Sequence, residues 1–427
     1  MAGGRGTRIS EFTNSIPKPM IRIGGKPILE HQIEVLKMQG FTDIIITIGY
    51  LSNAIIEYFG DGNRISPITG KNFGVNIEYY IEKEQLGNAG ALFYIKDKLK
   101  EDFLLINGDI IFNIDFNRFL DYHKQKEGLI TLFTHPNSHP YDSALIVANE
   151  DGSVEKWLSK EEERKEFYKN RVNAGIHILS SKVLDRKIVT QKIDLDRQIL
   201  KPFAGTGKMY IYDSPEYVRD MGTLERYKEV CKDYDKGIVE ARSLANRQKA
   251  IFLDRDGTIN EYVGFLKSIE ELKLIPGVTQ AIKKMHEAGY LVIVVTNQPV
   301  IARGEVSIDE LSQIHNKIET LLGMEGTYLD DIYYCPHHPH KGYAGERKEY
   351  KINCKCRKPK AGMLIEAAKR YNIDLSKSWM VGDGENDILA GKNAGCNTAL
   401  ITLDKKYYGQ TKTVKSLKDF VNKVLES

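Results

Sequence analysis

Short apolar segments alternate with amphipathic helical segments along most of this sequence, and the alternation limits the chain to few folds. Apolar runs typical of β-strands lie at residues 43–50, 103–108, 250–254, 291–296 and 378–382. The helical patterns at 31–40 and 279–289 each end in a glycine, which favours a left-handed cap. Strand–helix alternation of this kind predicts an α/β fold with mostly parallel sheets.

The chain of 427 residues is too long for one ordinary domain. Two segments resemble the start of an α/β domain with a phosphate-type turn: the opening AGGRGTR, and KAIFLDRDGT at 249–258. Residues 224–248 are polar and charged and lack an apolar β run, as expected of a closing helix and a tether. We therefore expect two different α/β domains, over 1–235 and 249–427, joined by a linker over 236–248.

Charge and composition exclude several partners. The formal net charge is only +3, and the Lys and Arg residues are scattered, so nucleic acid is not an expected partner. We find neither an apolar run long enough to cross a bilayer nor the apolar core of a secretory signal. Three of the five cysteines lie within 335–356, a crowding that suggests a metal before it suggests disulfides. We expect a reduced, cytoplasmic protein with no membrane partner.

Carboxylates and other polar side chains follow several apolar strands of the carboxy-terminal half. Asp254 and Asp256 end one strand, and their charges repel unless a cation lies between them, which implies Mg²⁺. The ends of parallel strands converge on one crevice, so residues at other strand ends can join this site. These further residues are Thr296 and Asn297 in VVTNQ, Lys358 in RKP, and Asp383 and Asp387 in VGDGEND.

Together these motifs resemble the haloacid dehalogenase superfamily of phosphatases, whose four motifs occur in order across most of 249–427. The resemblance implies that Asp254 is the nucleophile that forms an aspartyl-phosphate. It implies that Asp256 protonates the leaving alcohol and then activates water. Thr296 and Lys358 would hold the transferring phosphoryl oxygens. The implied Mg²⁺ ligands are the carboxylates of Asp254 and Asp383 and the backbone carbonyl of Asp256, with Asp387 in support.

A narrower signal is CPHHPH followed by CKCRKP. Cys335 with His337, and Cys354 with Cys356, offer four ligands of the type that bind zinc tetrahedrally. The alternative is a pair of surface loops with free thiols and solvated histidines. A zinc ion here would be structural and would fix the loop that carries Lys358.

These residues resemble the zinc-containing branch of the superfamily, which includes heptose-bisphosphate and histidinol-phosphate phosphatases. The matching motifs are DRDGTIN, TNQ, ARG at 302–304, the two metal-type pairs and RKP. The short intervals between motifs leave no room for a sizeable cap domain, which suits an extended sugar phosphate. The residues expected to contact substrate are Asn297, Arg303 and Arg357.

The amino-terminal half resembles sugar-1-phosphate nucleotidyltransferases over about residues 1–230. GGRGTR and PKPM are followed in family order by LGNAGAL (86–92), INGDIIF (106–112), VNAGIHIL (172–179) and RDMGT (219–223). The sugar phosphate oxygen is already anionic, so its attack on a nucleoside triphosphate needs alignment and charge neutralisation rather than a general base. The resemblance therefore implies a sugar phosphate and a nucleoside triphosphate as substrates, with Mg²⁺.

The same resemblance implies a role for individual residues. The triphosphate would be held by the backbone of Gly3, Gly4, Gly6 and Thr7 and by Arg8. Lys18 would lie between the two phosphates, and Asp109 and Asp220 would bind Mg²⁺. Leu86 and Gly87 would lie against the base, and Glu155, Lys156, Asn173 and Gly175 would face the sugar phosphate. Glu155 and Lys156 also fit a solvated charge pair, and Asn173 and Gly175 also fit a turn.

One departure from the family concerns the first strand. The family places an apolar strand directly before the glycine-rich turn, centrally in the sheet, and here Met1 and Ala2 precede the turn. Either Met1 is an internal methionine of a longer chain, or the domain is shortened and its nucleotide site damaged. We favour the first explanation, because the turn and every later motif are intact.

The two resemblances fit one pathway. A heptose 1,7-bisphosphate phosphatase yields heptose 1-phosphate, which is the substrate type of the first domain. We therefore expect a bifunctional enzyme of nucleotide-activated heptose synthesis. GTP is favoured as the nucleotide only because these two families occur together in one chain. Two alternatives stay open: an active phosphatase joined to a non-catalytic binding module, and a histidinol-phosphate phosphatase. An oligomer is possible.

Overall fold

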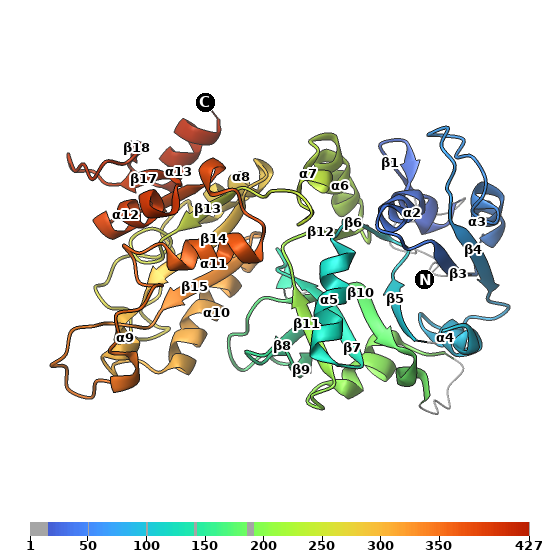
Figure 1. Cartoon of the computed structure of the whole chain (residues 1–427), viewed down its shortest axis with the longest axis horizontal. Coiled ribbons are helices and arrows are strands. Elements are labelled where there is room, and N and C mark those ends of the chain that lie inside the picture. Colours follow the sequence, from blue (N-terminus) through green and yellow to red (C-terminus); the bar gives the residue numbers. More distant parts are fainter. Residues whose placement is uncertain (1–15, 50, 100, 141–142, 186–191, 427) are drawn as a thin grey trace. The chain divides into compact units, whose positions relative to one another are not determined.

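The computed structural model describes residues 16–49, 51–99, 101–140, 143–185 and 192–426, which form two compact units (Figure 1). The first unit comprises Met1–His135, Ile146–Trp157 and Asn173–Ser243. The second comprises Pro136–Leu145, Leu158–Val172 and Leu244–Ser427. The division after Ser243 falls within 236–248, where the linker is expected, and the exact domain limits stay a prediction. No helix of the described residues is long and apolar enough to span a membrane.

The first unit begins with a β-hairpin, a helix and a parallel strand pair. Its elements are β1 (Arg22–Ile23), β2 (Lys26–Pro27), α2 (Ile28–Met38), β3 (Asp43–Ile48), α3 (Ser52–Phe59) and β4 (Asn76–Ile81). Helix α2 is followed by Gly40 at φ +87°, the left-handed conformation that its sequence predicts. Strands β3 and β4 pair in parallel from Asp43↔Asn76 to Ile48↔Ile81.

A six-stranded sheet and a separate strand pair form the rest of the first unit. The sheet has the order β11-β7-β10-β8-β9, with β5 also paired to β10, and β6 pairs with β12. The strands are β5 (Asp102–Ile106), β6 (Ile110–Asn113), β7 (Ile130–His135), β8 (Leu145–Ala148), β9 (Val154–Leu158), β10 (Val172–Ser180), β11 (Met209–Asp213) and β12 (Tyr217–Asp220). The helices are α4 (Gly90–Tyr94), α5 (Phe116–Lys126), α6 (Leu224–Asp235) and α7 (Ile238–Ala241). Several pairs, including β5–β10 and β6–β12, are antiparallel, so this unit is more mixed than the predicted parallel arrangement.

A cleft separates β3 from β5 in the first unit. Among the described strands, β3 pairs with β4 and β5 pairs with β10, and no pairing joins β3 to β5. The cleft has a volume of about 550 Å³ and is lined by apolar side chains of α2, β3 and β5. They include Leu29, Ile33, Ile44, Ile46 and Leu104. Among the described residues, the strands of this unit therefore do not form one continuous sheet.

The second unit contains one continuous parallel sheet in the order β15-β14-β13-β16-β17-β18. Its strands are β13 (Ala250–Leu253), β14 (Leu291–Asn297), β15 (Asp331–Cys335), β16 (Trp379–Gly382), β17 (Asn397–Ile401) and β18 (Lys412–Val414). Its helices are α8 (Val278–Glu287), α9 (Pro299–Ala302), α10 (Ile308–Met324), α11 (Gly362–Arg370), α12 (Glu385–Ala394) and α13 (Leu417–Phe420).

Both faces of the central strands are covered in this unit. Ile251 and Leu253 of β13 pack in a core with residues of α8, α10 and α13. Phe252, between them, packs in a second core with residues of α11 and α12. Alternate side chains of a strand point to opposite faces, so a strand buried on both faces must be apolar throughout. The continuous apolar runs at 250–253 and 291–295 follow from this layering.

Candidate functional site

Three carboxylates gather at the carboxyl edge of the parallel sheet. Asp254 directly follows β13, Asp383 directly follows β16, and Asp387 lies in α12. Strands β13 and β16 pair in register, and the Asp254 backbone N–H donates to Val381 (2.9 Å). One carboxyl oxygen of each aspartate lies within 4.8 Å of those of the other two. Oxygen ligands at this spacing fit Mg²⁺, the cation that the sequence predicts.

Lys358 brings a positive charge into this cluster. Its ammonium, almost fully buried, lies 2.8 Å from Asp254 Oδ1 and 2.6 Å from Asp387 Oδ1. Burial alone lowers the pKa of Lys358, but the two carboxylates outweigh it and raise the pKa to about 12. Lys358 is therefore charged at neutral pH and can neutralise phosphoryl oxygens.

The carboxylates hold more negative charge than Lys358 balances. Burial and the charge of Asp387 raise the pKa of Asp254 to about 6, against the opposing effect of Lys358. Burial and the charge of Asp254 raise the pKa of Asp383 to about 6. A divalent cation between these groups would relieve the repulsion, so their electrostatics as well as their spacing fit a metal site.

Asp256 lies beside this cluster and is held by several donors. Arg255 Nη2 donates to both of its carboxyl oxygens, at 2.9 and 2.8 Å. Asn260 Nδ2 donates at 3.0 Å and Gln298 Nε2 at 3.1 Å. Gly257, the next residue, has φ +75°, and a Cβ there would lie 2.1 Å from an Asp383 oxygen. Only glycine therefore fits this turn, which carries the Asp256 carboxylate to the edge of the site.

Two other predicted residues engage protein atoms at the same edge. Thr296 Oγ1 accepts a hydrogen bond from Gln298 Nε2 (2.9 Å). Asn297 donates to the Lys358 carbonyl and accepts from the Lys358 N–H, both at 3.0 Å. Its amide thus fixes the backbone of Lys358, and its predicted contact with substrate stays a prediction.

Arg303 and Arg357 are the remaining substrate-binding predictions of the second unit. The Arg303 guanidinium lies 4.2 Å from the ring centroid of Phe265 and 4.5 Å from that of Tyr343. Arg357 donates to the His337 carbonyl (3.1 Å). Their roles toward substrate stay predictions.

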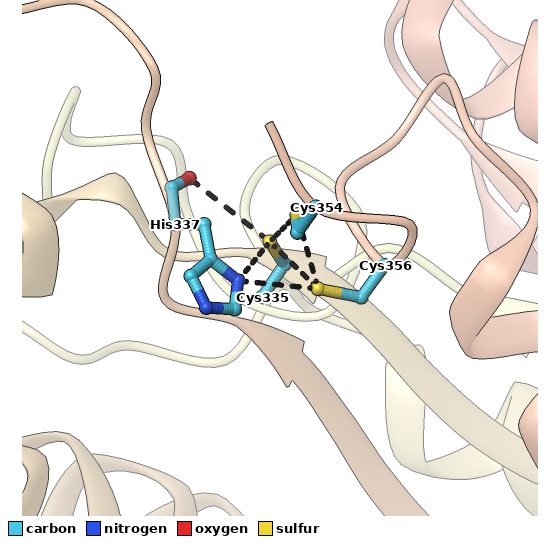
Figure 2. Close-up of side chains that lie close together, drawn as sticks. All are labelled: Cys335, His337, Cys354 and Cys356. Carbon is cyan, nitrogen blue, oxygen red and sulfur yellow. Dashed lines mark hydrogen bonds between the residues drawn. The ribbon is translucent and has the colours of Figure 1, made fainter. Parts of the chain in front are cut away.

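The four predicted zinc ligands converge, as Figure 2 shows. Cys335 Sγ lies 3.5 Å from Cys354 Sγ and 3.2 Å from Cys356 Sγ, and His337 Nδ1 lies 3.3 Å from Cys356 Sγ. All four ligand atoms lie within 4.8 Å of one another. Tetrahedral zinc, with Zn–S bonds near 2.3 Å, separates its ligand atoms by roughly 3.5–3.8 Å, so this donor set fits the ion.

Cys356 of this cluster favours the thiolate form that binds metals, whereas its hydrogen bond with Cys335 raises the pKa of the Cys335 thiol. The hydrogen bonds that Cys356 makes, first with Cys335 and then with Cys354 and His337, lower the pKa of Cys356 to about 5 and favour a thiolate. The Arg357 N–H donates to Cys354 Sγ (3.3 Å), next to Lys358 in the chain. The cluster therefore anchors the segment that delivers Lys358 to the carboxylates.

In the first unit, the two predicted Mg²⁺ ligands each have a cationic partner. Lys18 Nζ lies 3.1 Å from Asp109 Oδ2, and Arg226 Nη1 lies 2.7 and 2.8 Å from the Asp220 oxygens. The Met221 N–H donates to the Asp109 carbonyl (3.1 Å), which brings the two segments side by side. The predicted contacts of Gly3, Gly4, Gly6, Thr7 and Arg8 lie outside the described residues.

The predicted base-binding segment and one part of the predicted sugar site are tightly packed. Gly87 has φ +80°, and a Cβ there would lie 2.3 Å from the Ile193 carbonyl oxygen. Gly175 has φ +76°, and a Cβ there would lie 2.5 Å from Asn107 Nδ2. Leu86 is buried beside Gly87. Gly87 is thus required by its positive φ and by the close approach of the Ile193 backbone, and Gly175 is favoured by its positive φ.

The other predicted sugar contacts are engaged with neighbouring residues. Asn173 Oδ1 accepts from the Gly175 N–H (3.2 Å) and contacts His177 Nε2 (2.9 Å). Glu155 and Lys156 form a half-exposed ion pair with a separation of 3.1 Å. Their contacts with a sugar phosphate stay predictions.

Sequence reasoning missed several residues that contact the predicted ones. Arg255, Asn260 and Gln298 lie inside the motifs DRDGTIN and TNQ, so their position was itself a signal. His315, on α10, contacts Arg255 and lies 60 residues from it in the sequence. Only its occurrence among buried apolar residues of a helix could have drawn attention to it.

Comparisons with known proteins agree with both resemblances. The family model of nucleotidyl transferases matches residues 1–237, and that of haloacid dehalogenase-like hydrolases matches residues 163–395.

Two curated relatives correspond to the two resemblances. The D-glycero-beta-D-manno-heptose-1,7-bisphosphate 7-phosphatase of Pasteurella multocida is 46% identical over 160 residues, which are 37% of this chain and 84% of that protein. The mannose-1-phosphate guanyltransferase of Saccharomyces cerevisiae is 30% identical over 254 residues, which are 58% of this chain and 65% of that protein.

A solved structure, HddC from Yersinia pseudotuberculosis, aligns with 55% of this chain and 96% of its own, at 26% identity and a TM-score of 0.46. Each of the two family models covers more than half of the 427 residues, and both families consist of enzymes. The chain therefore belongs to the nucleotidyl transferase family and, through its other half, to the haloacid dehalogenase-like hydrolases.

Proposed function

We propose that this chain carries out two successive steps in the synthesis of a nucleotide-activated heptose. The second unit would remove the 7-phosphate of D-glycero-D-manno-heptose 1,7-bisphosphate. The first would transfer GMP from GTP to the resulting heptose 1-phosphate and release pyrophosphate. The observation that carries the phosphatase step is the convergence of three carboxylates and Lys358 at one sheet edge. The 46% identity to a heptose-bisphosphate phosphatase supports the choice of sugar.

In the phosphatase step, Asp254 attacks phosphorus and the bond from phosphorus to the sugar oxygen breaks. Asp256 gives its proton to that oxygen, and the alcohol leaves. Lys358 neutralises charge on the phosphoryl group. Asp256 then takes a proton from a water molecule, whose oxygen attacks the aspartyl-phosphate and releases orthophosphate. Mg²⁺, held by Asp254, Asp383 and the Asp256 carbonyl with Asp387 in support, would supply further neutralisation of the phosphoryl oxygens.

In the transferase step, an anionic oxygen of the sugar phosphate attacks the α-phosphorus of the nucleotide, and pyrophosphate leaves. Lys18 would neutralise the two phosphates as they approach. For Asp109 and Asp220 to hold Mg²⁺, their present pairing with Lys18 and Arg226 has to loosen. The choice of GTP over other nucleotides is part of the proposal and rests on the occurrence of these two families in one chain.

We also propose that zinc bound by Cys335, His337, Cys354 and Cys356 is structural, and that the enzyme acts in the cytoplasm, where these thiols stay reduced.

A second candidate keeps the phosphatase and makes the first unit a non-catalytic binding module. The cleft between β3 and β5 favours it, because a divided sheet supports a nucleotide site less rigidly.

One incubation tests both candidates. The chain is given heptose 1,7-bisphosphate and Mg²⁺ with each nucleoside triphosphate in turn, and orthophosphate and pyrophosphate are measured separately. We expect orthophosphate in every tube, and pyrophosphate with a nucleotide sugar only with GTP. Orthophosphate without pyrophosphate would favour the second candidate. Hydrolysis of histidinol phosphate in preference to the heptose substrate would contradict both.

A further inference from the structure

A fully buried arginine lies between the two aspartates of the phosphatase motif. Arg255 has no exposed side-chain surface, and one edge of its guanidinium faces Asp256. Nε lies 3.1 Å from Asp256 Oδ1, and Nη2 lies 2.9 and 2.8 Å from Oδ1 and Oδ2. A buried guanidinium requires a charged partner, and two parallel hydrogen bonds also fix the plane of the carboxylate.

The far edge of the same guanidinium contacts a histidine. Arg255 Nη1 lies 3.3 Å from His315 Nε2, and both side chains are buried. Arginine has only donors, so His315 Nε2 must accept and the ring proton must be on Nδ1. Burial and the positive charge of Arg255 lower the pKa of His315 well below its usual value, which keeps the ring neutral.

His315 is rigidly mounted. It belongs to α10, a helix of 17 residues whose first turn is closed by a capping box between Ser307 and Glu310. Ile314 and Ile318 of the same helix are buried in the sheet core. The His315 ring also contacts Tyr334 of β15, with 5.6 Å between centroids. A side chain fixed in this way can hold a flexible arginine in one orientation.

We propose that His315 is a positioning residue for the phosphatase reaction: it fixes the Arg255 guanidinium, which orients the Asp256 carboxyl for proton transfer. The inference rests on the proposed phosphatase function. Asp256 has to reach the leaving oxygen in one half-reaction and water in the next, so its orientation matters in both. Asn260 and Gln298 also bind Asp256, one oxygen each, and among the described residues Arg255 is the one that binds both oxygens.

The test compares two leaving groups in His315→Leu. A sugar alcohol needs a proton from Asp256 to leave, whereas p-nitrophenolate leaves as an anion. We expect His315→Leu to slow release of the sugar phosphate by about 10-fold or more, with KM changed by less than about 2-fold, because small misplacements of catalytic groups are costly. The first-turnover burst of p-nitrophenolate should keep its rate to within about 2-fold, because that step does not need the proton.

Conservative replacement separates positioning from packing. His315→Gln keeps an acceptor at similar reach, so we expect it to restore most of the sugar phosphate release. His315→Asn has an acceptor that is too short and should behave like His315→Leu, which keeps the test decisive if the leucine variant does not fold. His286→Leu is the matched control, since His286 lies in the same unit and contacts Asp330 instead (3.0 Å). The His286→Leu variant should leave unchanged the ratio of the rates measured with the two substrates.

Three results would overturn the inference. The first is that His315→Leu slows the reaction equally with both leaving groups. The second is that neither His315→Leu nor His315→Asn slows the reaction of the sugar phosphate. The third is that the His315→Gln enzyme is as slow as His315→Leu. Failure of the proposed function has a different signature: a wild-type protein that releases phosphate from neither substrate contradicts the phosphatase itself, and with it the role of His315 that rests on it.

Discussion

The two units differ in how their sheets support the predicted sites. In the second unit, six parallel strands are paired without interruption, and polar residues at the ends of β13, β14 and β16 meet at one edge. In the first unit, β3 with β4, β6 with β12 and the larger sheet form separate sets, and a cleft of about 550 Å³ lies between β3 and β5. The comparison indicates that a site built from the ends of several strands depends on the central strands of the sheet. These strands set the distances between all the other strands.

The charges differ in the same sense. Asp254, Asp383 and Asp387 converge and share one lysine, which leaves negative charge for a cation. Asp109 and Asp220 each have a cation of their own, Lys18 and Arg226. The carboxylates of the second unit are thus spaced as a metal site requires, whereas those of the first would have to exchange partners if they bind a metal as the sequence predicts.

The largest expected effect comes from Asp254→Asn. Removing the nucleophile should lower phosphatase activity by about 10⁴-fold or more, as for other covalent catalysts. Transfer of a nucleotide to heptose 1-phosphate should stay within about 2-fold, because that site belongs to the other unit. Phosphate and pyrophosphate release from the separate substrates measure the two effects. An equal loss of both activities would contradict independent sites.

Loss of the zinc ligands should destabilise the second unit alone. A structural zinc contributes on the order of 10 kcal/mol of binding free energy, so Cys356→Ser should lose the metal and unfold at a much lower temperature. Metal analysis and calorimetry of the variant measure this. Cys231→Ser, in α6, is the control. It should retain zinc, and both units should unfold at the same temperatures as in the wild type. A Cys356→Ser protein with normal stability would rule out a structural role.

Filling the cleft should stabilise the first unit. We expect an added amino-terminal segment of six residues rich in Val and Ile to pair with β3 and β5, and each buried polar group that gains a partner is worth about 1–3 kcal/mol. We expect the first unit to unfold at a higher midpoint temperature, and we expect pyrophosphate to form faster. The same segment with two prolines should do neither, since proline lacks the N–H that pairing needs. Equal effects of both segments would show that the cleft does not accept a strand.

The smallest effect concerns pH and Mg²⁺. The folded-state pKa values of Asp254 and Asp383, about 6, lie above the ordinary value of 3.8. These groups therefore bind protons more readily in the folded protein, and their contribution to stability falls as pH rises from about 4 to 6.

Above pH 6 both groups are charged and available to Mg²⁺, so the ion should raise the melting temperature more at pH 7.5 than at pH 5. Thermal denaturation with and without Mg²⁺ at both pH values measures the difference, and Asp383→Asn should reduce it. A larger Mg²⁺ effect at pH 5 would contradict the site.

Much of the fold follows from local patterns. The apolar runs at 250–254 and 291–296 correspond to β13 and β14, and the helical pattern at 279–289 corresponds to α8. Strands buried on both faces and helices with one apolar face leave clear signals in the sequence. The convergence of Asp254 with Asp383 was also predictable, because both directly follow strands of a parallel sheet.

Other contacts could not be predicted, because nothing local specifies them. His315 meets Arg255 only because α10 packs against β13, and a lone histidine in a helix has no characteristic spacing. The engagement of Asn297 with the Lys358 backbone depends on how the zinc loop folds back. The pairing of Asp220 with Arg226 competes with the metal role that the motif predicts.

The central claim, that one unit supplies the substrate of the other, is tested most directly by following phosphorus NMR of Asp254→Asn and wild type with GTP and Mg²⁺. For the variant we predict conversion of heptose 1-phosphate to a nucleotide sugar, while heptose 1,7-bisphosphate stays unchanged. Wild type should convert both, and its 7-phosphate signal should disappear before the diphosphate signals of the product appear. Direct conversion of the bisphosphate by the variant, or no conversion of heptose 1-phosphate by wild type, would contradict the account.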